Sequence, residues 1–367
     1  MKIRYALFAA LICCPFAALA APNGVSTTIQ PDVVYIEGGA AQYVNCDLLF
    51  RNTSSKPMEL TRIQITVFDA TGALELRKFI DTNGFAPSIQ TVPHRVIAPG
   101  GKILVFNPFF EFDKAIDLTR LEFEATFSVE KSDKEYTSTA TVYPQAYRTK
   151  TNLILPLQGR LIVHDGHDFY AHHRRLDYAL PIAGHFGIRS NFMRYAYDFC
   201  LIDPHGNLTT NTGGSNEEWL SFGATVVAPG AGKIVAAYAD QPDNFYHGKN
   251  YFDPELLPKD PMSFYGNYIL IDHLNGEFSL LGHLRKGSLR VKIGDLVAQG
   301  QPLAAVGASG SANNPHLHYE LRTGNGLNVE GLPSSFRGFR RVLGKRSIEL
   351  SDEGYLNSGD IAQSTTE

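Results

Sequence analysis

Short stretches of alternating apolar and polar residues, separated by polar turns, run through the first half of the chain. They lie at residues 43–50, 58–69, 102–106, 121–129 and 137–142, with turn clusters such as 52–57 and 98–101 between them. Regular short strands joined by polar turns are typical of two packed antiparallel sheets. The pattern therefore predicts an antiparallel β-sandwich over residues 24–147. No metal ligands or nucleophile gather there, so we expect an accessory domain, acting as a rigid adaptor or docking module.

Strand-like runs alternate with glycine-rich turns in the second half. They cover residues 224–236, 266–273, 278–284 and 291–303, and long helical periodicity is scarce after the N-terminal segment. This pattern predicts a mainly β protein, in which a compact antiparallel sheet domain over residues 153–342 follows a polar linker near 148–152. Residues 343–367 are expected to form a polar tail, frayed toward its end.

The first twenty residues have the composition of a secretory signal peptide. Lys2 and Arg4 precede an apolar stretch at residues 5–19, and Ala18-Leu19-Ala20 forms a small-x-small cleavage pattern. An uncleaved membrane anchor is the alternative, although the apolar stretch is short for a membrane span. We therefore expect a periplasmic or secreted protein that, once the signal peptide over residues 1–20 is removed, is not an integral membrane protein.

Composition narrows the choice of partners. The 367-residue chain has 19% charged and 44% hydrophobic residues, as in ordinary soluble domains, and its formal net charge of −4 argues against nucleic acid as a partner. Cys46 and Cys200 remain after signal cleavage; they could pair in an oxidising compartment, but each lies in an apolar run, which favours two buried free thiols. The sequence leaves the oligomeric state open.

Two histidines at strand spacing give the first candidate chemistry. His316 and His318 follow a glycine- and proline-containing turn, and the alternating apolar residues Leu317, Tyr319 and Leu321 mark the opposite face of the same predicted strand. Residues two apart on a strand point to one side. The pair therefore predicts a metal site, with an exposed histidine pair as the alternative.

A carboxylate inside another apolar strand adds a second candidate. Asp198 lies between Tyr197 and Phe199, where burial is costly unless the carboxylate pairs with a cation or binds a metal ion. From this segment alone, a salt bridge to Arg194 and metal ligation are equally compatible. His283 is a single histidine that closes the apolar run at residues 279–284.

These motifs together resemble a known family. Gly282-His283-Leu284, the G-D-x-V-x-x-G-Q segment at 294–301, the glycine turn at 307–310 and Pro315-His316-Leu317-His318-Tyr319-Glu320 are similar to lysostaphin-type (LytM-like) zinc metallopeptidases, which cut peptide bonds in bacterial peptidoglycan. The resemblance covers residues 161–322. It implies a LytM-like fold, with His318 and Asp198 as zinc ligands and His316 and His283 as catalytic histidines that do not bind the metal.

One position departs from the family pattern. The family carries a histidine ligand four residues before the aspartate, where this chain has Arg194. His173, in the segment 171–177, is the favoured replacement because a similar segment precedes the aspartate strand in divergent members. His185 is the second choice, although Arg189 stands where its aspartate should be, and His172 is the third. If none of them binds, the site is degenerate.

The resemblance implies a zinc-dependent endopeptidase that hydrolyses peptidoglycan peptides by means of a zinc-activated water. Two alternatives stay open. A catalytically inactive LytM-like relative would bind wall peptides or regulate a partner enzyme, and another zinc amidohydrolase would cleave amides outside the wall.

Overall fold

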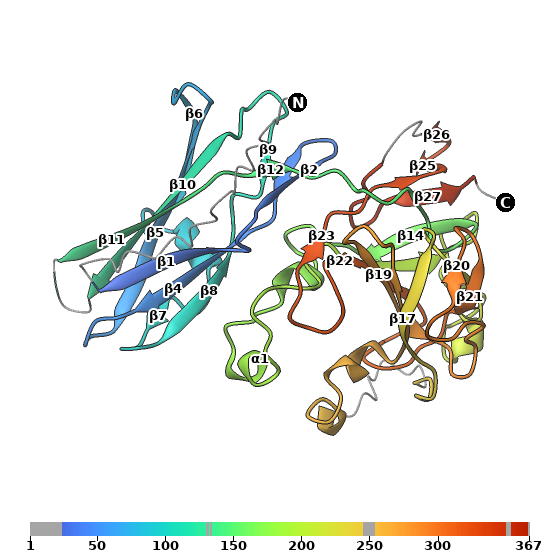
Figure 1. The fold of residues 1–367 in the computed structure, drawn as a ribbon. Coiled ribbons are helices and arrows are strands. Elements are labelled where there is room, and N and C mark those ends of the chain that lie inside the picture. The colour runs from blue at the N-terminus through green and yellow to red at the C-terminus, as the bar shows by residue number, and fades with distance from the viewer. Residues whose placement is uncertain (1–23, 130–131, 133, 245–253, 350–353, 366–367) are drawn as a thin grey trace, which may run out of the picture.

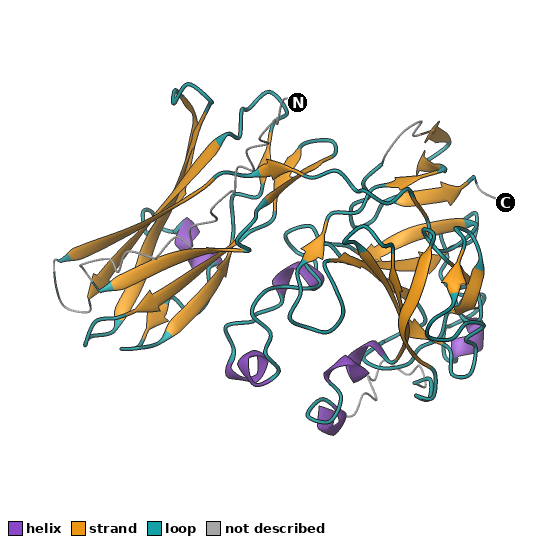
Figure 2. Cartoon of the chain, viewed as in Figure 1, coloured by secondary structure: helices purple, strands orange, loops and turns teal. Residues whose placement is uncertain are grey.

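Two β-rich domains lie side by side in the computed structural model (Figure 1), which describes residues 24–129, 132, 134–244, 254–349 and 354–365. Strands dominate, and the described α-helix, α1 (Pro181–His185), is short (Figure 2). The predicted mainly β fold is confirmed. The predicted signal peptide lies outside the described residues, and no helix within them has the length and apolar character needed to cross a membrane.

The N-terminal domain is a sandwich of two antiparallel sheets, as predicted. The rings of Phe50 and Phe127, one from each sheet, meet edge to face with centroids 5.3 Å apart, and both are fully buried. Alternate residues of a central strand such as β10 fill this core, because successive side chains on a strand point to opposite faces. One sheet is β1 (Val25–Gln30), β4 (Asp47–Asn52) and β8 (Lys102–Phe106); the other is β11 (Glu135–Val142), β10 (Arg120–Val129), β5 (Met58–Phe68) and β6 (Leu74–Ile80), with β7 (Val96–Ile97) beside β5 and η1 (Ser88–Thr91) nearby.

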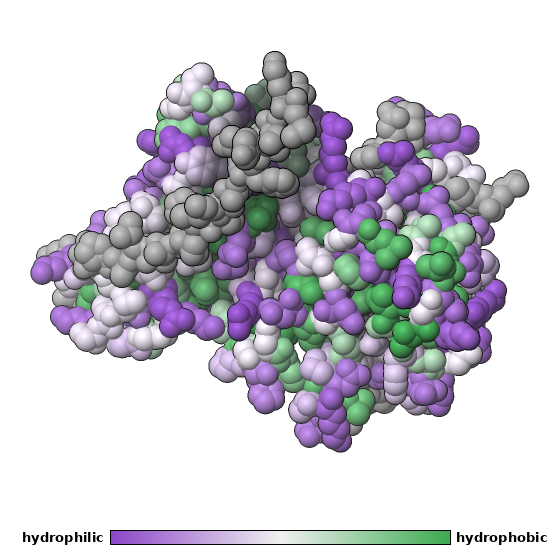
Figure 3. Space-filling view, in the orientation of Figure 1, coloured by the Kyte–Doolittle hydropathy of each residue, from purple (hydrophilic) through white to green (hydrophobic). Residues whose placement is uncertain are grey.

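A smaller sheet lies between this sandwich and the second domain (Figure 1). Its strand order is β12 (Gln145–Ala146), β2 (Tyr35–Gly38), β3 (Gln42–Val44) and β9 (Glu111–Phe112). In the space-filling view the two domains are in contact (Figure 3). Glu37 of β2 and Asp47 of β4 contact His167 and Arg194 of the second domain.

The second domain is built on one large sheet. Its core is apolar, and Phe199, Leu317 and Tyr319 at its centre are fully buried. The strand order is β20 (Leu296–Val297), β17 (Gly232–Tyr238), β18 (Asn267–Asp272), β19 (Phe278–Leu284), β22 (Leu317–Arg322), β15 (Tyr197–Leu201), β14 (Arg160–Asp165), β27 (Ile361–Ser364), β25 (Phe339–Leu343) and β26 (Arg346–Glu349), with β23 (Gly331–Leu332) beside β22. The pairs β16 (Thr225–Val227) with β21 (Pro302–Ala305) and β13 (Leu153–Ile154) with β24 (Phe336–Arg337), and the short helices η2 (His173–Arg175), η3 (Asn216–Glu218), η4 (Pro254–Leu256) and η5 (Pro261–Tyr265), complete it.

The end of the chain differs from the predicted polar tail over residues 343–367. Strand β27 lies inside the large sheet between β14 and β25, and Ala362 is fully buried in the core. A four-residue strand carries too little apolar pattern to be recognised in a polar segment. Its neighbours come from distant parts of the chain, so only the fold reveals that the described part of this segment belongs to the sheet.

The linker near residues 148–152 is fixed in place. Glu277, which is buried, accepts hydrogen bonds from Tyr147 Oη at 2.5 Å, from the amides of Lys150 and Thr151 at 2.8 Å each, and from Thr151 Oγ1 at 2.6 Å. One carboxylate of the second domain thus satisfies several polar groups of the connection.

Both cysteines are buried and free, which confirms the interpretation of their apolar surroundings. Burial raises the pKa of the Cys46 thiol to about 12, so the thiol stays protonated at neutral pH. The two domains are therefore not linked by a disulfide between Cys46 and Cys200.

Candidate metal centre

Three neighbouring strands place the candidate residues on one face of the large sheet. His318 lies on β22. Its partner on β15 is Asp198, and its partner on β19 is Gly282, the residue before His283. Because side chains alternate along a strand, the apolar neighbours of Asp198 and His318 enter the core while these two side chains face away from it. A regular strand would point His283 to the face opposite that of Gly282 and His318. Its irregular backbone instead brings the His283 ring to the same cavity, with its centroid 4.8 Å from that of His316.

The face opens into a cavity of about 340 Å³. The polar groups of the site form much of its wall, and no residue of the N-terminal domain lines it. The lining residues are His164, Asp165, His172, His173, Met193, Asp198, Phe264, Tyr265, His283, Ser311, Asn313, Asn314, His316 and His318.

Three imidazoles converge on one carboxylate oxygen. His318 Nδ1, His173 Nε2 and His316 Nε2 lie 3.0, 3.3 and 3.4 Å from Asp198 Oδ1. All four side chains are almost fully buried. Such a concentration of imidazoles around a buried carboxylate is typical of a metal centre or of a catalytic acid–base group.

The second ring nitrogen of each histidine is held by an acceptor. His173 Nδ1 donates to Gly166 O at 2.9 Å, His283 Nδ1 to Ser309 O at 2.8 Å and His316 Nδ1 to Asn314 O at 2.8 Å. His318 is held through Nε2, 2.9 Å from Glu320 Oε1. A carbonyl can only accept a hydrogen bond, so these contacts fix the proton on the bonded nitrogen and leave the other nitrogen for the site.

Burial and neighbouring charges push the pKa values in the site apart. Burial alone would raise the pKa of Asp198, but His316 and His173 outweigh it and hold that pKa well below its usual range. Burial would lower the pKa of His318, but its hydrogen bonds to Asp198 and Glu320 raise it to about 9. Burial, reinforced by the charges of His316 and His318, holds the pKa of His283 well below its usual value.

His283 also has an unusual backbone. Its φ is +58°, the left-handed region that residues other than glycine rarely adopt, and this costs about 1–3 kcal/mol. The bond from His283 Nδ1 to Ser309 O fixes the ring in this position. Strained residues of this kind are concentrated at active sites, which is consistent with a functional role for His283.

The donor set fits a metal ion. His173 Nε2 is buried and forms no hydrogen bond with any residue that the structure describes, although it points at Asp198. An unsatisfied buried nitrogen is costly unless it binds something. Ligand atoms of Asp165, His172, His173 and Asp198 also lie within 4.8 Å of one another. Two imidazoles and a carboxylate are donors that zinc prefers.

The structure separates the three candidates for the first ligand. His173 lies inside the group, in η2, whereas His172 is exposed beside it and contacts the carboxylate of Asp165. His185 is exposed on α1 and does not line the cavity. Arg194 does not pair with Asp198; it binds Asp47 and Glu330 at 2.8 and 2.6 Å.

Sequence reasoning did not find Asp165 as a site residue. It ends β14, where an irregularity in the pairing places it opposite Asp198. The bulge that shifts the register is not visible in the sequence. Glu320, the last residue of the histidine motif, has no role in the sequence prediction, and the structure makes it the partner of His318.

Part of the second domain matches a known protein family. Residues 220–330 match the family described as Peptidase family M23. The chain thus contains an M23 peptidase domain, as its resemblance to lysostaphin-type enzymes indicated. His283, His316 and His318 lie within the matched residues, whereas His173 and Asp198 precede them.

Two curated relatives show what similar sequences do elsewhere. The peptidoglycan DD-endopeptidase ShyB of Vibrio cholerae is 40% identical over 104 residues, covering 28% of this chain and 19% of that protein. The murein hydrolase activator EnvC of Escherichia coli is 36% identical over 70 residues, covering 19% of this chain and 16% of that protein. The chain thus spans less than a fifth of the length of either relative.

Among solved structures, a zinc containing peptidase from Vibrio cholerae is similar over 82% of this chain and 83% of that chain. The sequence identity is 13% and the TM-score is 0.24.

Proposed function

We propose that the chain is a zinc-dependent endopeptidase that hydrolyses peptide bonds in bacterial peptidoglycan. In this proposal His173, Asp198 and His318 hold the metal, and His316 and His283 handle protons. The observation that carries it is the convergence of three imidazoles on Asp198 Oδ1, one of them through a buried nitrogen that has no hydrogen-bond partner among the described residues.

A zinc ion held there would polarise the scissile carbonyl and lower the pKa of a bound water molecule toward neutrality. The protein groups have complementary tasks. His283 has a depressed pKa and a proton fixed on Nδ1, so its Nε2 is free to accept a proton. The pKa of His316 is raised because Asp198 outweighs burial, so His316 can hold a proton and deliver it to the leaving amine.

The proposed substrate and location follow from the family and from the N-terminal sequence. Relatives of the matched domain include peptidoglycan endopeptidases, which supports a wall peptide as the substrate. The predicted signal peptide would deliver the chain to the periplasm or the cell exterior, where peptidoglycan lies.

A second candidate is a catalytically inactive, wall-binding or regulatory protein. Arg194, at the position where the resembled family has its first histidine ligand, favours this reading, and EnvC is named as an activator. The two proposals differ in metal content and turnover. An inactive relative needs neither a zinc ion nor protonated His316.

The test is to digest purified peptidoglycan with the zinc-loaded chain and to identify new amine ends by mass spectrometry. We expect about one zinc per chain, new amine ends with the parent, and none with His316→Ala. His205→Ala is the matched control, because His205 lies in an exposed turn outside the cavity and its replacement should leave the products unchanged. Intact peptidoglycan after treatment with the zinc-loaded parent would contradict the enzyme proposal and favour the regulator.

A further inference from the structure

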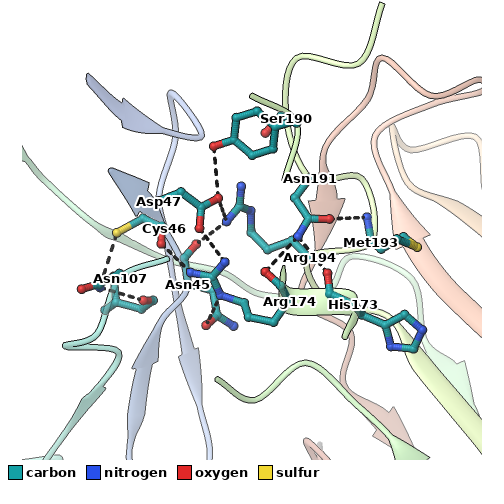
Figure 4. Close-up of polar contacts among 12 residues, drawn as sticks. Asn45, Cys46, Asp47, Asn107, His173, Arg174, Ser190, Asn191, Met193 and Arg194 are labelled. Atoms are coloured by element: carbon teal, nitrogen blue, oxygen red, sulfur yellow. Dashed lines mark hydrogen bonds and ion pairs between the residues drawn. The ribbon is translucent and has the colours of Figure 1, made fainter. Parts of the chain in front are cut away.

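A buried carboxylate of the N-terminal domain binds two arginines of the peptidase domain. Asp47 on β4 lies 2.6 Å from Arg174 Nη1 and 2.8 Å from Arg194 Nη1, and all three side chains are fully buried. Arg174 also donates to Asn45 Oδ1 at 3.1 Å and to the carbonyl of Cys46. Figure 4 shows Asp47 between the two guanidinium groups, with the ring of His173 pointing away on the far side.

The charges of this cluster are balanced. Arg194 has Glu330 as a second partner at 2.6 Å, so two arginines face two carboxylates. The arginines outweigh burial and hold the pKa of Asp47 below its usual value, which keeps Asp47 ionised. Removing one member of such a cluster leaves a buried charge without a partner. The two domains therefore depend on each other at this point.

A second carboxylate of the N-terminal domain contacts the same part of the peptidase domain. Glu37 on β2 accepts from His167 Nε2, with oxygens at 2.8 and 3.0 Å, and both side chains are buried. His167 directly follows Gly166, whose carbonyl accepts from His173 Nδ1. Arg174, the partner of Asp47, directly follows His173.

The segment 166–174 is thus held at both ends by the N-terminal domain, and His173 lies between the two contacts. Nothing comparable supports this histidine from within a sheet, because η2 is only three residues long. Asp198 and His318 differ, since each sits on a strand paired on both sides. The peptidase domain adds local hydrogen bonds: Gly166 O accepts from the His173 ring, and Asn191 Nδ2 donates to the carbonyls of His173 and Arg174 at 2.8 and 3.2 Å.

We propose that Asp47 and Glu37 are positioning residues of the metal centre, and that the N-terminal domain thereby completes the site of the peptidase domain. This inference rests on the proposed function, because it takes His173 as a metal ligand. The N-terminal domain lines no part of the cavity, so it acts through the backbone on either side of His173 and not by touching the substrate.

The test uses the full chain with Asp47→Asn, which keeps the shape of the side chain and removes its charge. Zinc affinity is measured by competition with a chromophoric chelator, and the visible absorption spectrum of the Co²⁺-loaded chain reports the ligand geometry. We expect about 10- to 100-fold weaker zinc binding, the range for groups that orient metal ligands, and an altered Co²⁺ spectrum. Asp117→Asn, an exposed carboxylate of the same domain, is the control and should bind like the parent.

Glu37→Gln tests the same claim should the Asp47 variant fail to fold, since it removes the charge of the other contact and leaves the arginine cluster intact. A folded Asp47 or Glu37 variant with the zinc affinity and Co²⁺ spectrum of the parent would overturn the inference alone. A parent chain that binds no zinc would overturn the proposed function and the inference with it. Zinc binding without wall cleavage would remove only the enzyme proposal, because these readouts do not need turnover.

Discussion

The two domains use buried charge differently. In the described part of the N-terminal domain, Glu37 of the smaller sheet and Asp47 of the sandwich are the buried carboxylates, and both bind the peptidase domain. In the peptidase domain, buried charged and imidazole groups surround Asp198 at one end of the strands. Each domain also has a main core of apolar side chains.

This difference shows which buried charges hold the two domains together and which belong to the candidate metal centre. Burying an ionised group is costly unless a partner compensates it, so buried charges stay where they have a further task. The N-terminal domain keeps its buried carboxylates toward its neighbour. The peptidase domain keeps buried charges at the cavity, and also at the domain contact (Arg174, Arg194) and at the linker (Glu277). Each of the following variants disturbs one side of this division.

The largest effect is expected from the two histidines of β22 and its preceding turn. His318→Ala should lower zinc affinity by more than about 100-fold, because a ligand is lost rather than its supporting partner. His316→Ala should retain about one zinc and lower kcat by roughly 10²- to 10⁴-fold, the range for a proton-transfer group. Metal analysis and wall-digestion rates of the two proteins check this. Equal zinc loss in both variants would mean that the pair acts as two ligands.

A change in the sandwich core should affect stability alone. Phe50→Ala removes a fully buried ring that packs on Phe127, and should lower the free energy of unfolding by about 3–5 kcal/mol. Zinc per folded chain should stay that of the parent. Chemical denaturation and metal analysis measure the two quantities. Phe79→Ala is the control, since Phe79 is exposed. Zinc loss in a Phe50 variant that still folds would contradict the expectation that the sandwich core affects stability alone.

Glu320→Gln should weaken the metal centre without removing a ligand. Glu320 accepts from His318 Nε2 at 2.9 Å and from Tyr265 Oη at 2.6 Å, and its loss of charge leaves Arg322 without compensation. We expect a decrease in zinc affinity of about 10- to 100-fold, measured by chelator competition. Glu349→Gln, at an exposed carboxylate, should bind zinc like the parent. Unchanged affinity in the Glu320 variant would remove its orienting role.

The smallest expected effect is a pH dependence at the domain contact. Burial would lower the pKa of His167, but Glu37 outweighs it and raises the pKa above 6.5. The contact therefore stabilises the fold fully below about pH 6.5 and loses this contribution as pH rises through the folded pKa. The difference in Tm between the parent and Glu37→Gln, both measured with chelator, should shrink as the pH rises above about 6.5. A difference that grows with pH would contradict the ion pair.

Period-two patterns in the sequence were sufficient to predict the sandwich, the sheet-rich second domain and the shared face of His316 and His318. Strand β8 has the predicted bounds, residues 102–106. The missing parts depend on distant partners. Asp47 and Arg174 lie 127 positions apart, and their pairing leaves no local pattern. The placement of Asp165 depends on a bulge, and β27 on neighbours elsewhere in the chain.

Arg194 shows how a family pattern can mislead locally. Its sequence position suggested either a missing ligand or a salt bridge with Asp198, and the structure places it with Asp47 and Glu330 instead. The segment around Arg194 gives no sign of a partner in another domain. The first ligand, proposed as His173, therefore stays a prediction that metal analysis must test.

The linker held by Glu277 has a consequence for how the two domains meet. Because the amides of Lys150 and Thr151 and the Thr151 hydroxyl are bound to Glu277, the linker has little freedom to move. Each domain therefore stays at a high effective concentration relative to the other. Docking then costs less entropy than it would between separate molecules. The ion pairs of the buried carboxylates Glu37 and Asp47 therefore form between domains that the tether already holds close together.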